Sequence, residues 1–340
     1  MPAPTAGGEH HFCVGVGNIV VGIDHRLRRD GGVDIEWTVQ FFCLFNLDSK
    51  NYRLPNLPEL PKGTSPMVVL SQVCDYTTGT FQSIAKPVFV NLENIFDKKT
   101  NSIEIHQPQN NLDVSFGFKG GHVHLKAETE AYSCNLEMSG ADRVMWMTDN
   151  ALKTDGLIRE GVEGDRSFYY SLHELPVTGA LNIEAIESSD VQVSGAGWID
   201  RQWGDFLTRN WEWTSFRFAD GDRVNTYNFD SGYQVGLLQT SDGKNTPFNS
   251  FKVVQNSYAK SKNNVWFSYG WDYHMPVKDG AYHLVPLSPK NVIAQGENEV
   301  LFEGLSRLLD SYGNQVGWAV TETMDIRKVH NGPYDKFNNF

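Results

Sequence analysis

Short hairpin signals recur along this chain between runs of alternating apolar and polar residues. An Asp-Gly pair occurs at residues 30–31, 220–221, 242–243 and 279–280, and a Tyr-Gly-Asn turn occurs at 312–314. Glycine supplies the positive φ that tight hairpin turns require. A signal repeated this often predicts a meander of antiparallel strands, so we expect an all-β fold.

The first half of the chain contains a clear pair of strands. Between residues 33 and 45, apolar side chains from Val33 to Phe41 alternate with polar ones, as in a half-buried strand. We expect this strand to pair with residues 13–27 through the turn at 30–31. A third strand is expected at 67–73, after a proline-rich loop at 54–66.

The length of 340 residues fits two domains of ordinary size, ~150 residues each. Pro176 follows one strand-like run and precedes a new alternating run at 179–193. We therefore expect an N-terminal β domain at 1–176, a C-terminal β domain at 177–330 and a tail at 331–340.

The charge balance opposes a polyphosphate partner, because 29 Lys and Arg face 41 Asp and Glu, a net charge of -12. No run approaches the ~18 apolar residues that span a bilayer, and the first residues lack the features of a signal peptide. We expect no nucleic-acid partner, no membrane span and a cytoplasmic location.

Four of the nine tryptophans lie within sixteen positions, at 198, 203, 211 and 213. In an extended strand, Trp198, Asp200 and Gln202 share one face, and in the next strand Trp211, Trp213 and Arg217 share one face. Mixed aromatic and polar faces suit an apolar ligand pocket. They also suit an ordinary sandwich core.

Asp200 is the residue in this region that bears most directly on chemistry. Burial among indoles raises the pKa of a carboxyl and makes it a usable acid. The alternative is a structural ion pair between Asp200 and its neighbour Arg201, which would fix a corner of the fold.

Two histidines, His122 and His124, fall on the same side of a strand, a spacing that can chelate a metal ion. No nearby Cys, Asp or Glu completes a recognisable set of ligands, and no phosphate-binding loop or nucleophile motif is present. We expect neither a metal nor an organic cofactor.

The Trp-rich segment Gly195-x-Gly-Trp-Ile-Asp-Arg-Gln-Trp-Gly-Asp-Phe206 resembles the lipocalin-like family that contains hydroxyneurosporene synthase (carotenoid 1,2-hydratase) and AttH-type proteins. The resemblance continues through Trp211-x-Trp213 and Arg217 to Gly221, and more weakly through segments 269–276, 301–304 and 317–322. It covers residues 170–327 well and the first half by general layout.

This resemblance implies two lipocalin-like β-barrel or sandwich domains with a pocket for a hydrophobic small molecule, and activity without a cofactor. Some members of the family add water to a terminal alkene, and fungal relatives are pericyclases that fold a polyene into a Diels-Alder product. The acid that begins the family's first-strand motif is missing from the corresponding segment, Ile19–Asp24.

The missing acid favours cyclisation, so the sequence predicts a cofactor-independent cyclase of terpenoid or polyketide biosynthesis, with a [4+2] pericyclic reaction. The alternatives are a hydratase or isomerase that uses general acid catalysis, and a non-catalytic lipophile-binding protein. We expect Asp200, Arg217 and Gln202 to be catalytic. The expected substrate-binding residues are Trp37, Trp198, Trp203, Trp211, Trp213, Asn225, Tyr233, Trp271, Trp318 and Glu322.

Overall fold

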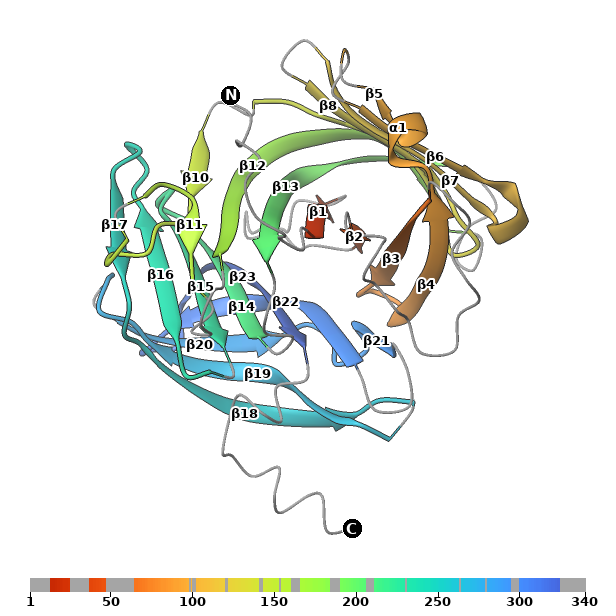
Figure 1. Cartoon of the computed structure of the whole chain (residues 1–340). Coiled ribbons are helices and arrows are strands. Elements are labelled where there is room, and N and C mark those ends of the chain that lie inside the picture. Colours follow the sequence, from red (N-terminus) through yellow and green to blue (C-terminus); the bar gives the residue numbers. More distant parts are fainter. Residues whose placement is uncertain are drawn as a thin grey trace.

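The computed structural model describes residues 13–24, 37–46, 64–97, 99, 102–119, 122–140, 143–152, 154–159, 166–183, 190–205, 211–229, 231–262, 264–278, 280–294 and 300–324. Within these residues the chain forms two curled antiparallel sheets, each rolled toward a half-barrel (Figure 1). The expected all-β, lipocalin-like architecture is confirmed.

The first sheet takes its strands in the order β4-β3-β2-β1-β13-β12-β9-β8-β7-β6-β5, with β10 and β11 paired to β12. Its strands are β1 (Cys13–Asp24), β2 (Trp37–Asn46), β3 (Ser65–Asp75), β4 (Thr80–Val90), β5 (Phe96–Asp97), β6 (Ser102–Gln107), β7 (Leu112–Lys119), β8 (His122–Glu128), β9 (Ser133–Met138), β10 (Val144–Trp146), β11 (Leu157–Ile158), β12 (Arg166–Asn182) and β13 (Val191–Asp205). A one-turn helix, α1 (Leu92–Ile95), and a 3₁₀ turn at Pro108–Asn110 join its strands.

The second sheet takes its strands in the order β17-β16-β15-β14-β23-β22-β20-β19-β18, with β21 paired to β22. Its strands are β14 (Trp211–Phe218), β15 (Arg223–Phe229), β16 (Gln234–Gln239), β17 (Asn245–Phe248), β18 (Lys252–Lys260), β19 (Trp266–His274), β20 (Ala281–Pro286), β21 (Val292–Ala294), β22 (Val300–Asp310) and β23 (Gln315–Met324).

The hairpin signals of the second half are confirmed. Gly221, Gly243 and Gly313 all have positive φ, between 84° and 93°, at the turns of the β14–β15, β16–β17 and β22–β23 pairs. Gly280 follows the turn that joins β19 to β20. In the first half, β1 pairs with β2 as expected, and the strand expected at 67–73 is present as β3, which pairs with β2. The turn at 30–31, residues 33–36 and residues 54–63 lie outside the described residues.

The division between the sheets differs from the expected one at residue 176. β12 runs through Pro176 without interruption, both β12 and β13 belong to the first sheet, and the change of sheet falls between Asp205 and Trp211. Proline is tolerated here because its carbonyl, which accepts a hydrogen bond from Ser139, points past the end of β9. The missing N–H lies on that same side, away from β13, so no bond between β12 and β13 is lost.

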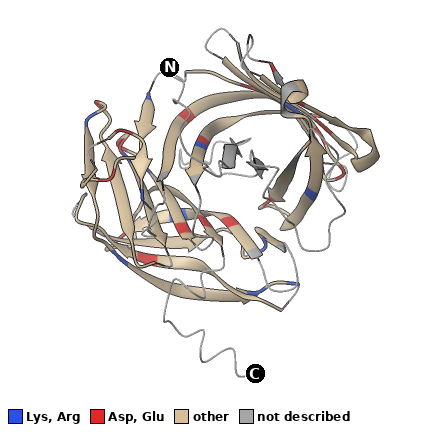
Figure 2. Ribbon diagram, in the orientation of Figure 1, with Lys and Arg blue, Asp and Glu red and all other residues tan. Residues whose placement is uncertain are grey.

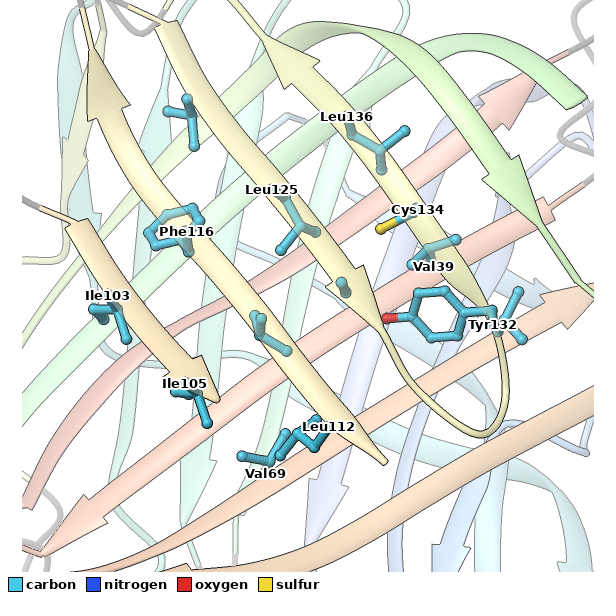
Figure 3. Packing of buried hydrophobic residues seen from close by; sticks show 14 of the residues in the cluster. Val39, Val69, Ile103, Ile105, Leu112, Phe116, Leu125, Tyr132, Cys134 and Leu136 are labelled. Carbon is cyan, nitrogen blue, oxygen red and sulfur yellow. The ribbon is translucent and has the colours of Figure 1, made fainter. Parts of the chain in front are cut away.

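Each sheet encloses its own apolar interior. In the first, side chains from β6 to β9 meet those from β2 and β3, among them Leu125, Val39 and Val69 (Figure 3). In the second, Phe216, Phe267 and Phe302 lie at the centre. Within the described ranges no helix is long and apolar enough to cross a membrane.

A third cluster of buried side chains lies between the two sheets, where β12 and β13 face β14, β15, β22 and β23. We call it the interface layer. Its apolar members are Met145, Met147, Ile158, Tyr169, Trp198, Trp213, Tyr227, Phe229, Val235, Leu237, Leu305 and Val320. Acidic positions also occur on strands of both sheets in this region (Figure 2).

Candidate active site between the two sheets

Alternation along β13 sends one set of side chains into the interface layer. Trp198, Asp200 and Gln202 point toward the second sheet, whereas Ile199 packs into the interior of the first. Contacts across the layer fix this orientation, since the hydroxyl of Tyr227 donates to Oε1 of Gln202 at 2.9 Å. The shared face that the sequence predicted for these three residues is therefore present.

Asp200 lies at the centre of a hydrogen-bonded group that spans both sheets. Its Oδ1 accepts hydrogen bonds from the hydroxyls of Tyr169, at 2.5 Å, and Ser171 on the neighbouring strand β12. From the second sheet, Nδ2 of Asn225 donates to Oγ of Ser171 at 2.9 Å. The N–H of Trp198 also acts on the Asp200 carboxyl and lowers its pKa, and the buried Oδ2 has no closer hydrogen-bond partner among the described residues.

Burial raises the pKa of Asp200 to about 6, although the hydrogen bonds from Ser171 and Tyr169 and the charge of Arg217 act in the opposite direction. Desolvation prevails because only 6% of the residue is exposed. No ion pair joins Asp200 to Arg201 within the described residues. The cation that acts on this carboxylate is Arg217, from the other sheet.

Arg217 lies against the indole of Trp198, with its guanidinium carbon 3.8 Å from the ring centroid. The indole covers the flat face of the guanidinium, whereas the Nε and Nη2 atoms at its edge are buried and have no hydrogen-bond partner among the described residues. Burial lowers the pKa of Arg217 to about 10, which leaves the group charged at neutral pH.

A second buried arginine, Arg223, stands opposite Arg217 in the β14–β15 pair. It forms an ion pair with Glu174 and donates to the carbonyl of Gly221 at 2.5 Å. Glu174 reaches it from a β-bulge in β12, where φ is 52° and the register shifts between Leu172 and Leu175. The bulge re-aims the carboxylate across the layer, a common role of bulges beside functional sites.

A second carboxylate in the interface layer belongs to Glu322 on β23, which stands opposite Trp213 of β14. Its Oε1 accepts a hydrogen bond from Nε1 of Trp211 at 2.5 Å. Burial raises the pKa of Glu322 to about 7; the Trp211 N–H lowers it, and the charge of Asp200 raises it further. The ionisation of one carboxylate therefore depends on the charge of the other.

Several expected site residues line the same layer. Trp213 is 3% exposed and its Nε1 has no hydrogen-bond partner among the described residues. Trp318 and Tyr233 are partly buried against the layer, and Trp318 stands opposite Arg217 in the β14–β23 pair. Gln202 is engaged at both ends, because its Nε2 donates to Oγ of Ser167 at 2.7 Å. Both ends of its amide are therefore bound by protein groups.

Other expected residues lie elsewhere. Trp203 is on the opposite face of β13, where it stacks on Phe168 with ring centroids 5.5 Å apart and contacts Trp146 and Tyr170. Trp271 is fully buried inside the second sheet. Trp37 begins β2, but its side chain lies outside the described ones.

The sequence predictions missed Tyr169, Ser171, His173, Glu174 and Arg223. Residues 169, 171 and 173 lie on one face of β12, because every second residue of a strand does. This spacing is the signal that could have found them. Burial lowers the pKa of His173 well below its usual range, with Arg217 and Arg223 acting in the same direction, so its imidazole is neutral.

The described residues contain no group of three or more His, Cys, Asp or Glu side chains able to hold a metal ion. His122 instead places its Nδ1 2.9 Å from a carboxylate oxygen of Glu137 on the neighbouring strand. A surface hollow of about 490 Å³ lies at the end of the first sheet, beside His106, Asp113 and Glu128. None of the expected site residues lines it, so we place the site in the interface layer.

Comparison with known proteins agrees with this architecture. The sequence matches the family model for AttH-like proteins over residues 92–323. Among solved structures, the chain is similar to a candidate AttH from Nitrosomonas europaea, with a TM-score of 0.70 and 16% identity over 92% of each chain. It is also similar to kievitone hydratase from Nectria haematococca, with a TM-score of 0.62 and 10% identity over 91% of this chain and 88% of that one.

At these identities the structural likeness shows a shared fold. No curated protein matches the sequence at a significant level.

Proposed function

This chain belongs to the AttH-like family, and from that premise we propose that it is a cofactor-independent hydratase or isomerase that transfers a proton to a carbon–carbon double bond of a largely apolar substrate. The substrate would bind in the interface layer. Asp200 would be the general acid.

One observation carries the proposal, namely the state of Asp200. Its carboxyl is buried in an aromatic layer, Oδ1 is held by two hydroxyl donors, and Oδ2 has no close hydrogen-bond partner among the described residues. Oδ2 is therefore the oxygen that can carry a proton and give it to a ligand. Because the pKa of Asp200 is raised to about 6, a useful fraction is protonated near neutral pH.

Hydration would proceed in two steps. Asp200 gives its proton to one alkene carbon, and the electron pair of the double bond forms the new C–H bond and leaves a cation at the other carbon. A water molecule then adds to that cation and gives a proton to the Asp200 carboxylate, which restores the acid. The face of Trp213 would stabilise the cation.

The fold likeness to kievitone hydratase supports this reading, since that protein's name assigns it a hydration. An isomerase would use the same acid and then remove a different proton. Two buried carboxylates whose environments raise their pKa values are the equipment that either reaction needs.

Cyclisation is the second candidate. The absence of the first-strand acid favoured it, but Asp200 and Glu322 supply acids from other strands, which weakens that argument. The buried Nε and Nη2 of Arg217 remain in its favour, because they could bind a carbonyl oxygen and lower the barrier of a pericyclic step.

The experiment is to incubate the protein with kievitone and with geranic acid in H₂¹⁸O and to analyse the products by mass spectrometry. Hydration incorporates one ¹⁸O atom, whereas cyclisation incorporates none. Asp200→Asn should lower the rate by roughly 10²- to 10⁴-fold, because an amide cannot replace a general acid. Asp149→Asn, at a buried carboxylate that caps a turn through the Ala151 amide, is the matched control.

A folded Asp200→Asn protein with unchanged rate would overturn the proposed role of this residue. A product without ¹⁸O and with a new ring would favour the cyclase.

A further inference from the structure

The edge of the Arg217 guanidinium is a set of donors that the described protein leaves unused. Its Nε and Nη2 are buried without a hydrogen-bond acceptor, and the indole N–H of Trp213 in the same layer is also without one among the described residues. A buried donor that lacks an acceptor loses the hydrogen bonds it made to water. Three such nitrogens in one layer indicate a ligand that brings acceptor oxygens.

The surroundings of Arg217 point to an acceptor with negative charge. The groups that act most strongly on Arg217 through their charge include Asp200, Arg223, Glu174 and Tyr169. Glu174 is already paired with Arg223. Tyr169 is neutral, because burial raises its pKa well above the usual value. Asp200 is then the remaining anion that could balance Arg217.

In the proposed reaction, Asp200 is neutral before it transfers its proton, so its negative charge is then absent. To give a proton, Asp200 must first be neutral, and Arg217 is then a buried cation with no carboxylate of its own. An isolated charge in this environment is unfavourable, and a ligand carboxylate would compensate it with a bidentate pair. The planar fork of arginine matches the geometry of a carboxylate.

We propose that Arg217 is the anchor for a carboxylate on the substrate, so that the enzyme acts on an unsaturated, apolar carboxylic acid and not on a neutral hydrocarbon. The inference rests on the proposed function for the position of the double bond, but the binding site itself does not require turnover. The indole of Trp198 lies over the guanidinium, and Nε and Nη2 would donate to the ligand carboxylate. The apolar chain of the ligand would lie against Trp213.

This arrangement couples binding to catalysis. A carboxylate bound at Arg217 brings a negative charge close to Asp200, and a nearby like charge disfavours ionisation of a carboxyl. The substrate would thereby help to keep Asp200 in its protonated form. A neutral alcohol of the same shape would neither fill the fork of Arg217 nor promote this protonation.

The test compares matched acids and alcohols as ligands: geranate with geraniol, and retinoate with retinol. Binding is followed at pH 7.5 through quenching of tryptophan fluorescence, since Trp198 and Trp213 lie in the layer. For at least one pair, the acid should bind about 10-fold or more tightly than the alcohol, which is the range for a hydrogen bond to a charged group.

Three variants test whether Arg217 is the residue that makes the acid bind more tightly than the alcohol. Arg217→Met should abolish it while the affinity for the alcohol stays as in the wild type, and this unchanged affinity also shows that the layer is intact. Arg217→Lys keeps the charge but loses the fork, and should retain only part of the preference. Arg143→Met, at an exposed arginine that donates to the carbonyl of Ser241, should leave it unchanged.

If neither acid binds more tightly than its alcohol, or if Arg217→Met keeps the preference, the proposal is wrong. The binding test and the ¹⁸O test can fail independently of each other. A preference for the acid without ¹⁸O incorporation would reject hydration and leave the anchor standing, whereas hydration without the preference would do the reverse.

Discussion

Tyr169 donates its phenolic hydrogen to Oδ1 of Asp200 at 2.5 Å, from the strand next to the one that carries the carboxylate. This bond stabilises the ionised form and holds the pKa of Asp200 below the value that burial alone would give. Tyr169→Phe should therefore raise the pKa of Asp200 above about 6, by about one to two units, since a hydrogen bond to a charged group contributes about 1.5–3 kcal/mol.

The measurement is the pH–rate profile. The fall in rate that accompanies loss of the proton from Asp200 should move to higher pH in Tyr169→Phe. Tyr170→Phe is the matched control, because Tyr170 packs against Trp146 with ring centroids 4.9 Å apart, on the other face of the same strand. A profile that shifts equally in both variants would contradict the role given to Tyr169.

Variants of two tryptophans on opposite sides of the first sheet test whether the ligand binds in the interface layer. Trp213 faces the layer, and Trp203 packs on Phe168 behind it. Trp213→Phe should weaken the binding of retinol or geraniol several-fold, because it reduces the aromatic face and removes an N–H. Trp203→Phe should leave those affinities unchanged and lower Tm, since it loosens an aromatic cluster. Fluorescence binding and thermal melts on both variants check this; the reverse pattern would place the ligand in the first sheet.

Local signals were enough to predict most of the fold. Gly221, Gly243 and Gly313 sit at positive φ in the turns where the pattern required them. The face shared by Trp198, Asp200 and Gln202 also follows from a period of two. Residue pattern within one strand determines these features, so no long-range information was needed.

The parts that could not be predicted depend on strand pairing. Alternation places Trp203 and Asp200 on opposite faces of β13, but it does not tell which face meets the other sheet. Ser171 reaches Asp200 through the β12–β13 register, which pairs the two residues across the strands. Pro176 was misleading for the same reason, since the consequence of a missing N–H depends on the neighbour it points toward.

Stability should fall as pH rises through the range in which the layer carboxylates ionise. The folded protein holds the proton of Asp200 up to about pH 6 and that of Glu322 up to about pH 7, against ordinary values of 3.8 and 4.5. Because the unfolded chain releases these protons first, their stabilising contribution is full below about pH 4 and is lost as pH rises through 6 to 7.

Each shift corresponds to a contribution on the order of 3 kcal/mol. Glu322→Gln should therefore flatten the dependence of the free energy of unfolding on pH between 4 and 7.5, measured by urea denaturation. Glu104→Gln, at an exposed side chain on β6, should leave the slope as in the wild type. A Glu322→Gln curve parallel to that of the wild type would mean that Glu322 is not held protonated.

The close approach of β14 and β23 behind Arg217 gives a test of the register that builds the site. A Cβ at residue 317 would collide with the backbone carbonyl of Arg217, which cannot move without its strand. Gly317→Ala should therefore destabilise the protein by about 1–3 kcal/mol or more and displace the guanidinium.

Gly313, in the adjoining turn, provides the control. Its φ is 84°, and an added Cβ meets nothing within 4 Å. Gly313→Ala should cost about 1–2 kcal/mol of conformational strain and nothing else. Melts and the geranate–geraniol comparison on both variants separate the effects: loss of stability in both, with loss of the acid preference only in Gly317→Ala, is expected. A Gly317→Ala protein as stable as the wild type and with the same preference would show that β14 and β23 do not pair in this register.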